Sequence, residues 1–347
     1  GICGLACIFA ALWWPAAAEA QGGPTTLGPW LSRPLPAQSH QLPSWGRGRH
    51  FYVHTFNGSI YRTSIVNGQI AAWQNAGAYA GGPHGFVVTV ANNVPYAFRN
   101  GHVIRYNVDK TFNITGMSCL EWASGSCDGA PGGAFGSIKY MWDTAVYVPL
   151  GRHYVFHLGG FNMTHEAYDV RLMHRKPLPL AAPVAFPAAG DAPTHKPYKA
   201  AFFKASDNHG FIYLGTLDRA VWRMRVNADG STGPWQATCT TPAAGNNRGD
   251  MFVIDDQLFV VRGKKVYQAT INRTNGALSP WRDDPPDLSE LQVTVTWGIT
   301  EPEPASYGIV GDHVCLTGTT KVFCAPIKRS QPGQPSNGAY LPLYRRR

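Results

Sequence analysis

The stretch that decides the fold spans residues 211–235 and reads FIYLGTLDRAVWRMRVNADGSTGPW. An apolar run at 211–214 is followed, after a short connection, by an alternating segment at 221–226, which is the pattern of two antiparallel strands joined in a hairpin. The segment at 229–234 is rich in turn-forming residues and leads to Trp235, which we expect to pack from a further strand. The stretch therefore predicts three consecutive antiparallel strands.

The alternating segment occurs six times along the chain. Each copy has an aliphatic or aromatic pair, then alternation, then a terminal aliphatic residue, and each follows another apolar strand. Measured at the terminal residue, successive copies are 43, 64, 54, 45 and 56 residues apart. With the strand that leads into each repeat, every unit has four strands, which is the size of one propeller blade. The copies are Ile60-Tyr61-Arg62-Thr63-Ser64-Ile65, Val103-Ile104-Arg105-Tyr106-Asn107-Val108, Ala167-Tyr168-Asp169-Val170-Arg171-Leu172, Val221-Trp222-Arg223-Met224-Arg225-Val226, Val266-Tyr267-Gln268-Ala269-Thr270-Ile271 and Val322-Phe323-Cys324-Ala325-Pro326-Ile327.

The composition agrees with an all-β fold. The chain has 347 residues, of which 44% are hydrophobic, 15% are charged, 38 are glycine and 27 are proline. So many backbone-breaking residues exclude all-α folds and coiled coils, while the apolar fraction is sufficient for a large core. We therefore predict a six-bladed β-propeller built from four-stranded antiparallel blades.

The N-terminal segment is expected to close the ring. Thr26-Leu27-Gly28-Pro29-Trp30 resembles the fourth-strand segment Gly233-Pro234-Trp235, although no repeat precedes it. We predict that it pairs with the strand at 322–327, so that the N-terminus completes the last blade. The segment 337–342 is a competitor for this place, and its use would make a seventh, partial blade possible.

The recurring aromatic pair, the Asp-Gly or Asn-Gly turn and the Pro-Trp strand resemble kelch-type β-propeller repeats of secreted proteins. The resemblance covers about residues 24–330. The diglycine typical of these repeats is complete at Gly159-Gly160 and is reduced to one glycine at Gly215, Gly263 and Gly318. The resemblance implies a propeller and no particular activity, because this fold serves many functions.

The N-terminus indicates secretion. An apolar run at 2–13 is too short to span a bilayer, and Ala18-Glu19-Ala20 matches the small-residue pattern of a signal peptidase site. We therefore expect a signal peptide at 1–20, the propeller at 21–330 and a basic tail at 331–347, with no transmembrane span. The protein is predicted to be extracellular, or periplasmic if its source is bacterial.

The mature chain would keep five cysteines, and an oxidising compartment favours their pairing. Short separations predict two disulfides, Cys119 with Cys127 and Cys315 with Cys324, and leave Cys239 over. A two-residue turn at 319–320 would place the second pair directly opposite in a hairpin. Four Asn-x-Ser/Thr sequons predict glycosylation in a eukaryotic source, at Asn57, Asn113, Asn162 and Asn272.

Two segments, 109–145 and 173–199, interrupt the repeat period. We expect both to be surface loops. Because the second segment is rich in proline and therefore extended, it is alternatively an arm that clasps a neighbouring molecule.

Residues with catalytic or metal-binding chemistry form no convincing group. The segment 227–235 resembles the Asp-box of sialidase propellers but is interpreted as a turn followed by a core tryptophan. His153 and His157 would share a face of one strand, which is weak evidence for a metal. The acidic pairs Asp255-Asp256, Asp283-Asp284 and Glu301-Pro302-Glu303 lie in expected connections, where carboxylates are normally solvated. No catalytic residue, metal site or cofactor is predicted.

The candidate ligand face is the end of the ring at which the second-to-third-strand hairpins meet. The chain carries a net charge of +9, and four of the six hairpin tips offer a cation. Positive potential of this kind attracts anionic polymers or acidic protein surfaces. The sequence favours a non-catalytic extracellular binding or assembly module for an anionic glycan or a protein partner, without nucleic acid and with its oligomeric state open. The alternative is a secreted carbohydrate-active enzyme of the glycosidase, lyase or epimerase type. The predicted ligand residues are Arg99, His165, Arg219, Lys264, Lys265 and Lys321, with Asn57 at the first tip.

Overall fold

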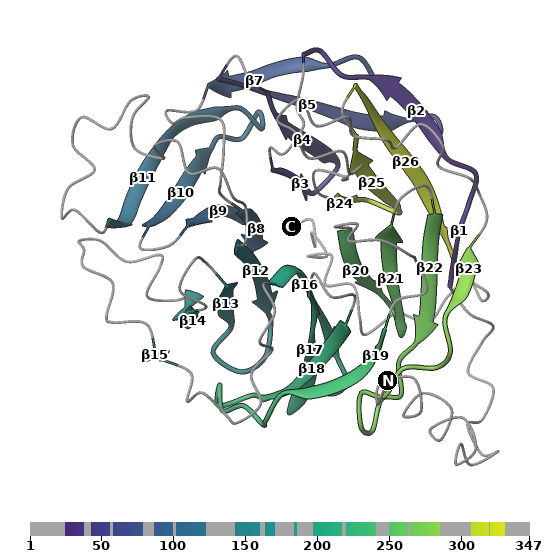
Figure 1. The fold of residues 1–347 in the computed structure, drawn as a ribbon. Coiled ribbons are helices and arrows are strands. Elements are labelled where there is room, and N and C mark those ends of the chain that lie inside the picture. Colours follow the sequence, from purple (N-terminus) through teal and green to yellow (C-terminus); the bar gives the residue numbers. More distant parts are fainter. Residues whose placement is uncertain are drawn as a thin grey trace, which may run out of the picture.

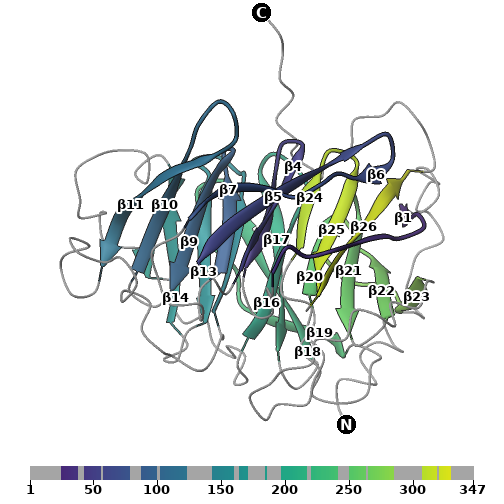
Figure 2. The ribbon, with the colours of Figure 1, turned by 90° about the horizontal axis from the view of Figure 1, so that it is seen from above.

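The chain folds as an all-β propeller, with antiparallel sheets arranged around a common centre (Figure 1). The computed structural model contains six such sheets among the residues that it describes. Figure 2 shows the same ring from the side, with the sheets standing next to one another. The described residues are 25–37, 43–55, 58–78, 87–99, 102–122, 143–159, 164–170, 184–185, 197–216, 220–240, 250–262, 265–284, 307–318 and 320–329.

The first three sheets follow one another along the chain, and within each the strands lie from the centre outward in sequence order. Sheet 1 consists of β3 (Ser44–Arg47), β4 (His50–His54), β5 (Ser59–Val66), β6 (Gln69–Ile70) and β7 (Gln74–Ala78). Sheet 2 consists of β8 (Val87–Ala91), β9 (Val94–Arg99), β10 (His102–Val108) and β11 (Ile114–Trp122). Sheet 3 consists of β12 (Asp143–Val148), β13 (Tyr154–Gly159), β14 (Thr164–Asp169) and β15 (Val184–Ala185).

The other three sheets complete the circle, and the last one also takes in the N-terminal strands. Sheet 4 consists of β16 (Pro197–Lys204), β17 (His209–Thr216), β18 (Ala220–Asn227) and β19 (Gln236–Thr240). Sheet 5 consists of β20 (Asp250–Ile254), β21 (Gln257–Arg262), β22 (Lys265–Thr270) and β23 (Arg282–Asp284). Sheet 6 consists of β24 (Tyr307–Val310), β25 (His313–Thr317), β26 (Lys321–Lys328), β1 (Thr26–Leu27) and β2 (Leu31–Pro34).

The core lies between neighbouring sheets. Alternating apolar side chains of each sheet pack on the facing side chains of the next, which is why the repeat pattern has period two. Each of six buried clusters contains residues of two adjacent sheets, and one of them joins sheet 6 to sheet 1. Pairs that represent the clusters are Tyr52 and Tyr106, Phe98 and Val155, Phe156 and Ile212, Tyr213 and Met251, Phe252 and Val314, and Phe51 and Val322.

The N-terminal strands close this ring, as the sequence predicts. Leu27 lies opposite Ile327, and Arg33 lies opposite Val322, so β1 and β2 are the outer strand of sheet 6. Asp255, in the turn between β20 and β21 of the adjacent sheet 5, accepts a hydrogen bond from Thr25 Oγ1 (2.6 Å) and pairs with Arg329 Nε (3.0 Å), and it therefore bonds to the residue before β1 and to the residue after β26. The competing segment 337–342 lies outside the described residues.

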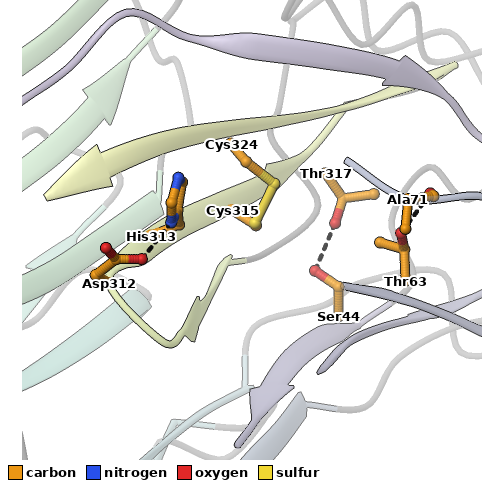
Figure 3. The surroundings of a disulfide bond; sticks show 8 residues. All are labelled: Ser44, Thr63, Ala71, Asp312, His313, Cys315, Thr317 and Cys324. Carbon is orange, nitrogen blue, oxygen red and sulfur yellow. Dashed lines mark hydrogen bonds and ion pairs between the residues drawn. A yellow bond between two sulfur atoms is a disulfide. The ribbon is translucent and has the colours of Figure 1, made fainter. Parts of the chain in front are cut away.

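The predicted disulfide between Cys315 and Cys324 is confirmed (Figure 3). The two residues lie directly opposite each other on β25 and β26, with their Cα atoms 4.1 Å apart. Beside them, Thr317 Oγ1 donates a hydrogen bond to Ser44 Oγ and ties sheet 6 to sheet 1. Cys239 is buried in β19. The Cys119 side chain and Cys127 lie outside the described part, so this second disulfide stays a prediction.

Other sheets carry a tyrosine and an arginine at the position of the disulfide. Tyr52 lies opposite Arg62 in sheet 1, and Tyr213 lies opposite Arg223 in sheet 4. In all three sheets, this cross-strand pair lies two residues along the strands from the pair that contains the first residue of the repeat copy. The tyrosine–arginine pairs therefore have the same register as Cys315 and Cys324. In each of these sheets, the third residue of the repeat copy therefore lies opposite the equivalent residue of the preceding strand.

The tyrosine hydroxyls at this position connect neighbouring sheets. Tyr52 donates a hydrogen bond to the Phe112 carbonyl (2.8 Å) in sheet 2, and Tyr213 donates one to the Gly276 carbonyl (2.7 Å) in sheet 5. Both acceptors lie in the turn between the third and fourth strands of the next sheet. The turns between third and fourth strands thus take part in the contacts between sheets.

The structure corrects the predicted position of the third repeat copy. Ala167, its first residue, pairs with Phe156, and β14 begins at Thr164, three residues before the predicted copy. Residues 171 and 172 lie outside the described part of the chain. The connection from β13 to β14 is longer than its counterpart in sheet 2, which shifts this copy along the strand.

The two interruptions of the period are also not plain surface loops. They contain strand β11, the fourth strand β15, and the beginnings of β12 and β16. Asp283 and Asp284 lie in strand β23 and not in a connection. None of the described segments forms a helix long and apolar enough to cross a membrane.

Candidate functional site

The two ends of the ring differ in the connections that they carry. Because strands within a sheet are antiparallel, the hairpins between second and third strands lie at the same end as the beginnings of the innermost strands. We call this the hairpin end, and its connections are 54–59, 99–102, 159–164, 216–220, 262–265 and 317–321. The opposite turn end carries the connections 47–50, 91–94, 148–154, 204–209, 254–257 and 310–313.

The predicted ligand residues are only in part within the described structure. Lys265 begins β22 and is exposed, and Lys321 begins β26 and is partly exposed, so both lie at the hairpin end. Arg99 ends β9 and His165 is the second residue of β14, and for both only the backbone is described. Arg219, Lys264 and Asn57 lie outside the described residues. The role of this set in binding stays a prediction.

A polar cluster that the sequence analysis missed lies at the centre of the hairpin end. Lys199, Asp250 and Tyr307 lie near the beginnings of β16, β20 and β24, the innermost strands of three successive sheets. Lys199 Nζ is 3.9 Å from Asp250 Oδ1, and the Tyr307 ring packs on Phe252 with the ring centres 5.2 Å apart. The three residues are 51 and 57 positions apart, close to the repeat period, and this spacing is the signal that could have identified them.

Asp250 is the buried member of this cluster. Its side chain has no exposed surface, whereas that of Lys199 is 20% exposed. Asp250 Oδ1 accepts the Met251 amide hydrogen (2.9 Å), and among the described residues Oδ2 has no hydrogen-bond partner. Burial raises the pKa of the Asp250 carboxyl, and the Lys199 charge and the Met251 amide oppose this shift. Burial and the nearby Asp250 charge also raise the pKa of Tyr307.

Comparable polar residues on other innermost strands have structural partners. Thr144 Oγ1 in β12 accepts the Ala200 amide hydrogen (2.9 Å) across the boundary between sheets 3 and 4. Ser44 in β3 accepts a hydrogen bond from Thr317 across the boundary between sheets 6 and 1. Burial of a carboxylate with one unsatisfied oxygen costs stability, and such groups are concentrated at functional sites. The cluster of Lys199, Asp250 and Tyr307 is therefore the candidate functional site.

The histidine pair is not arranged as the sequence predicted. His157 is buried in β13 and stacks on Phe98, with the ring centres 5.9 Å apart. His153 precedes the strand, has a φ of 61°, and bonds through Nδ1 to Tyr147 Oη (2.7 Å). The expectation of a shared strand face is wrong because the turn reaches as far as His153. Within the described ranges, no group of three or more His, Cys, Asp or Glu residues could hold a metal ion.

The acidic segments have structural roles where they are described. In the segment that resembles an Asp-box, Asp229 Oδ1 accepts the Ser231 amide hydrogen (2.9 Å), and Trp235 is buried in the core. This supports the interpretation as a turn with a core tryptophan. Asp255 is part of the closing contacts described above, while Glu301 and Glu303 lie outside the described residues.

Comparison with known proteins supports the fold. No protein-family model and no curated protein matches the sequence, so the kelch resemblance stays a prediction. Many solved structures are similar, and in three of them sequence identities of 8 to 12% make this a likeness of fold alone. The three are a Carbohydrate-Active Enzymes Family AA12 protein from Trichoderma reesei (8% identity, 90% of this chain and 100% of that chain, TM-score 0.52), the pyranose dehydrogenase PQQ domain from Coprinopsis cinerea (11%, 90% and 99%, 0.52) and AofleA from Arthrobotrys oligospora (12%, 90% and 90%, 0.50).

Proposed function

We propose that the protein is an extracellular, non-catalytic β-propeller that binds an anionic glycan at its hairpin end. The observation that carries the proposal is the position of three lysines at this end, Lys199 at the centre and Lys265 and Lys321 at the hairpins. Their summed potential would attract a polyanion over a distance of about one Debye length, roughly 8 to 10 Å. The net charge of +9 supports the same partner class.

The proposal includes the architecture and the compartment. We infer that each of the six sheets is one blade of a kelch-like propeller spanning 21–330. The Cys315–Cys324 disulfide supports an oxidising compartment, which is consistent with a signal peptide at 1–20. The sequons at Asn113 and Asn272 lie beside turns of the end opposite the hairpins, and glycans there would leave the hairpin end open.

A glycan is favoured over an acidic protein by the names of two similar folds. The AA12 protein is named as a carbohydrate-active enzyme, and the Coprinopsis domain is named as part of a pyranose dehydrogenase. At such low sequence identity, the roles of individual residues cannot be transferred from these proteins. They support only the choice of sugars as the first ligands to test.

A second candidate function is that of a carbohydrate-active enzyme, and Asp250 is the observation that favours it. A buried carboxyl with a raised pKa is suited to general acid catalysis. Glycoside hydrolysis normally takes a second carboxyl about 5 to 10 Å away. The charged and titratable neighbours described for Asp250 are Lys199 and Tyr307, and this arrangement favours binding.

The test compares charge reversal at the two ends of the ring. We expect Lys265→Glu with Lys321→Glu to elute from a sulfated-dextran column at much lower salt than the parent. The matched control is Arg49→Glu with Arg152→Glu, which makes the same change of net charge on exposed turn-end residues. The control should keep most of the parent's retention. Equal losses in both variants would show that retention follows net charge and would overturn the proposal.

A further inference from the structure

We propose that Lys199 contacts the anionic group of the ligand and that its binding is coupled to uptake of one proton by Asp250. This inference rests on the proposed function and adds its regulation, because the affinity for the anion would rise as the medium becomes more acidic.

The geometry leaves Lys199 able to serve both partners. Its Nζ is 3.9 Å from Asp250 Oδ1, which is longer than a direct hydrogen bond of about 2.7 to 3.2 Å. The two charges therefore attract each other across the boundary between sheets 4 and 5 without close contact. Lys199 lies near the beginning of β16 at the hairpin end, and one fifth of its side chain is exposed to solvent.

A small number of described groups determine whether the Asp250 carboxyl is ionised or protonated. Lys199 on β16 favours the ionised carboxyl, and Tyr307 on β24 faces the same site. On β21 the residue opposite Asp250 is Val261, which is apolar. Within its own strand the Met251 amide satisfies one carboxyl oxygen. Lys199 is thus the one side chain among these that compensates the buried negative charge.

An anion on Lys199 would disturb this balance. Its negative charge offsets the ammonium charge that stabilises ionised Asp250, so the pKa of the carboxyl rises on binding. At a pH between the free and bound pKa values, Asp250 therefore takes up a proton. Linkage is reciprocal, and protonation of Asp250 strengthens anion binding by the same factor. For one proton the affinity increases at most about tenfold per pH unit.

The experiment is calorimetric titration with sucrose octasulfate, because its sulfates stay ionised over the whole range and any pH dependence belongs to the protein. Measurements from about pH 4.5 to about pH 7.5, in pairs of buffers with different ionisation enthalpies, give the protons taken up. We expect Asp250→Asn to bind the probe but to lose up to one proton of the parent's uptake. Parent-like uptake in Asp250→Asn would assign the linkage to histidines and overturn the inference.

A second measurement does not depend on the stability of that variant. NMR titration of the parent with ¹³C-carboxyl-labelled aspartate should show the Asp250 midpoint moving upward when the probe is added. An unchanged midpoint with bound probe contradicts the coupling and leaves the proposed function intact. Failure of the parent to bind the probe at any pH, together with its failure on the column, would instead contradict the proposed function itself.

Discussion

The hairpin end and the turn end of this ring use their charged residues differently. At the turn end, Asp109 accepts the Asn113 amide hydrogen, and Asp229 accepts the Ser231 hydroxyl and amide hydrogens; these bonds lower the pKa of both carboxyls. Asp255 bonds to Thr25 before β1 and to Arg329 after β26 in the closing sheet. At the hairpin end, Lys265 and Lys321 stand at the tips, and a buried carboxylate keeps one oxygen without a described partner. Hydrogen bonds join neighbouring sheets at both ends, as Thr317 and Ser44 do at the hairpin end. The ends differ in the exposed lysines and the buried carboxylate of the hairpin end, where the proposed function places the ligand.

The largest expected effect is a loss of stability at the turn end. A Cβ at Gly151, which has a φ of +50°, would lie 1.9 Å from the Ala228 carbonyl oxygen of the next sheet. We expect Gly151→Ala to lower the free energy of unfolding by at least about 3 kcal/mol. Gly68→Ala is the control, because Gly68 has a similar φ of +71° but open space, and it should cost only about 1 kcal/mol. Urea denaturation of the parent and the two variants gives these free energies of unfolding. An equal loss in both variants would contradict the close approach of Gly151 to Ala228 of the next sheet.

Acid should destabilise the ring through a buried histidine. His54 bonds to Tyr106 Oη (3.0 Å) and to the Pro43 carbonyl (3.0 Å), and burial lowers its pKa from 6.5 to about 3. His54 therefore binds a proton more readily in the unfolded chain than in the folded protein. Its contribution to the free energy of unfolding is fully present above pH 6.5 and is lost as the pH falls toward 3. The contribution is at most about 1.4 kcal/mol per pH unit. In His54→Gln, this part of the slope in a series of unfolding curves should disappear, and an unchanged slope would contradict the assignment.

The closing contacts should have a smaller effect. Asp255→Ala removes two partners, Thr25 and Arg329, and places alanine at a φ of 55°. We expect a loss of about 1 to 3 kcal/mol in the free energy of unfolding. Asp256→Ala in the same turn is the control, since its carboxyl bonds only to neighbouring Gln257 among the described side chains. A cost no greater than that of the control would show that closure does not depend on Asp255.

The smallest expected effect on stability comes from the hairpin end. Lys265→Glu with Lys321→Glu should change the free energy of unfolding by less than about 0.5 kcal/mol, because Lys265 is exposed and Lys321 is partly exposed. The same variant should lose retention on sulfated dextran. A large loss of stability would mean that these lysines belong to the scaffold, and the two ends would then not differ in the way described.

The strands and the closure were predictable because they depend on local patterns. Alternation marked the third strands, and a Gly-Pro-Trp segment marked the N-terminal partner of β26. The disulfide followed from the short separation of the two cysteines and from the hairpin register. The copy at 167–172 was misplaced because its register depends on the length of a connection, which the alternation does not encode.

The central site was not predictable in the same way. Lys199 Nζ lies 3.9 Å from Asp250 Oδ1 only because sheets 4 and 5 pack side by side, and the two residues are far apart in the sequence. The innermost strands carry no motif, and the spacing of Lys199, Asp250 and Tyr307 near the repeat period does not by itself mark Asp250 as buried. Single charged residues at the beginnings of apolar strands can be recognised as one cluster only once the order of the sheets in the ring is known.

The most direct test of the account is to map the lysines that a bound polyanion covers. Acetylation rates of individual lysines, measured by mass spectrometry with and without sucrose octasulfate, report both ends of the ring at once. The account predicts that the probe slows acetylation of Lys199, Lys265 and Lys321 several-fold and leaves the exposed turn-end residues Lys110 and Lys328 unchanged. Equal protection of Lys110 and Lys328, or protection of these two alone, would contradict binding at the hairpin end.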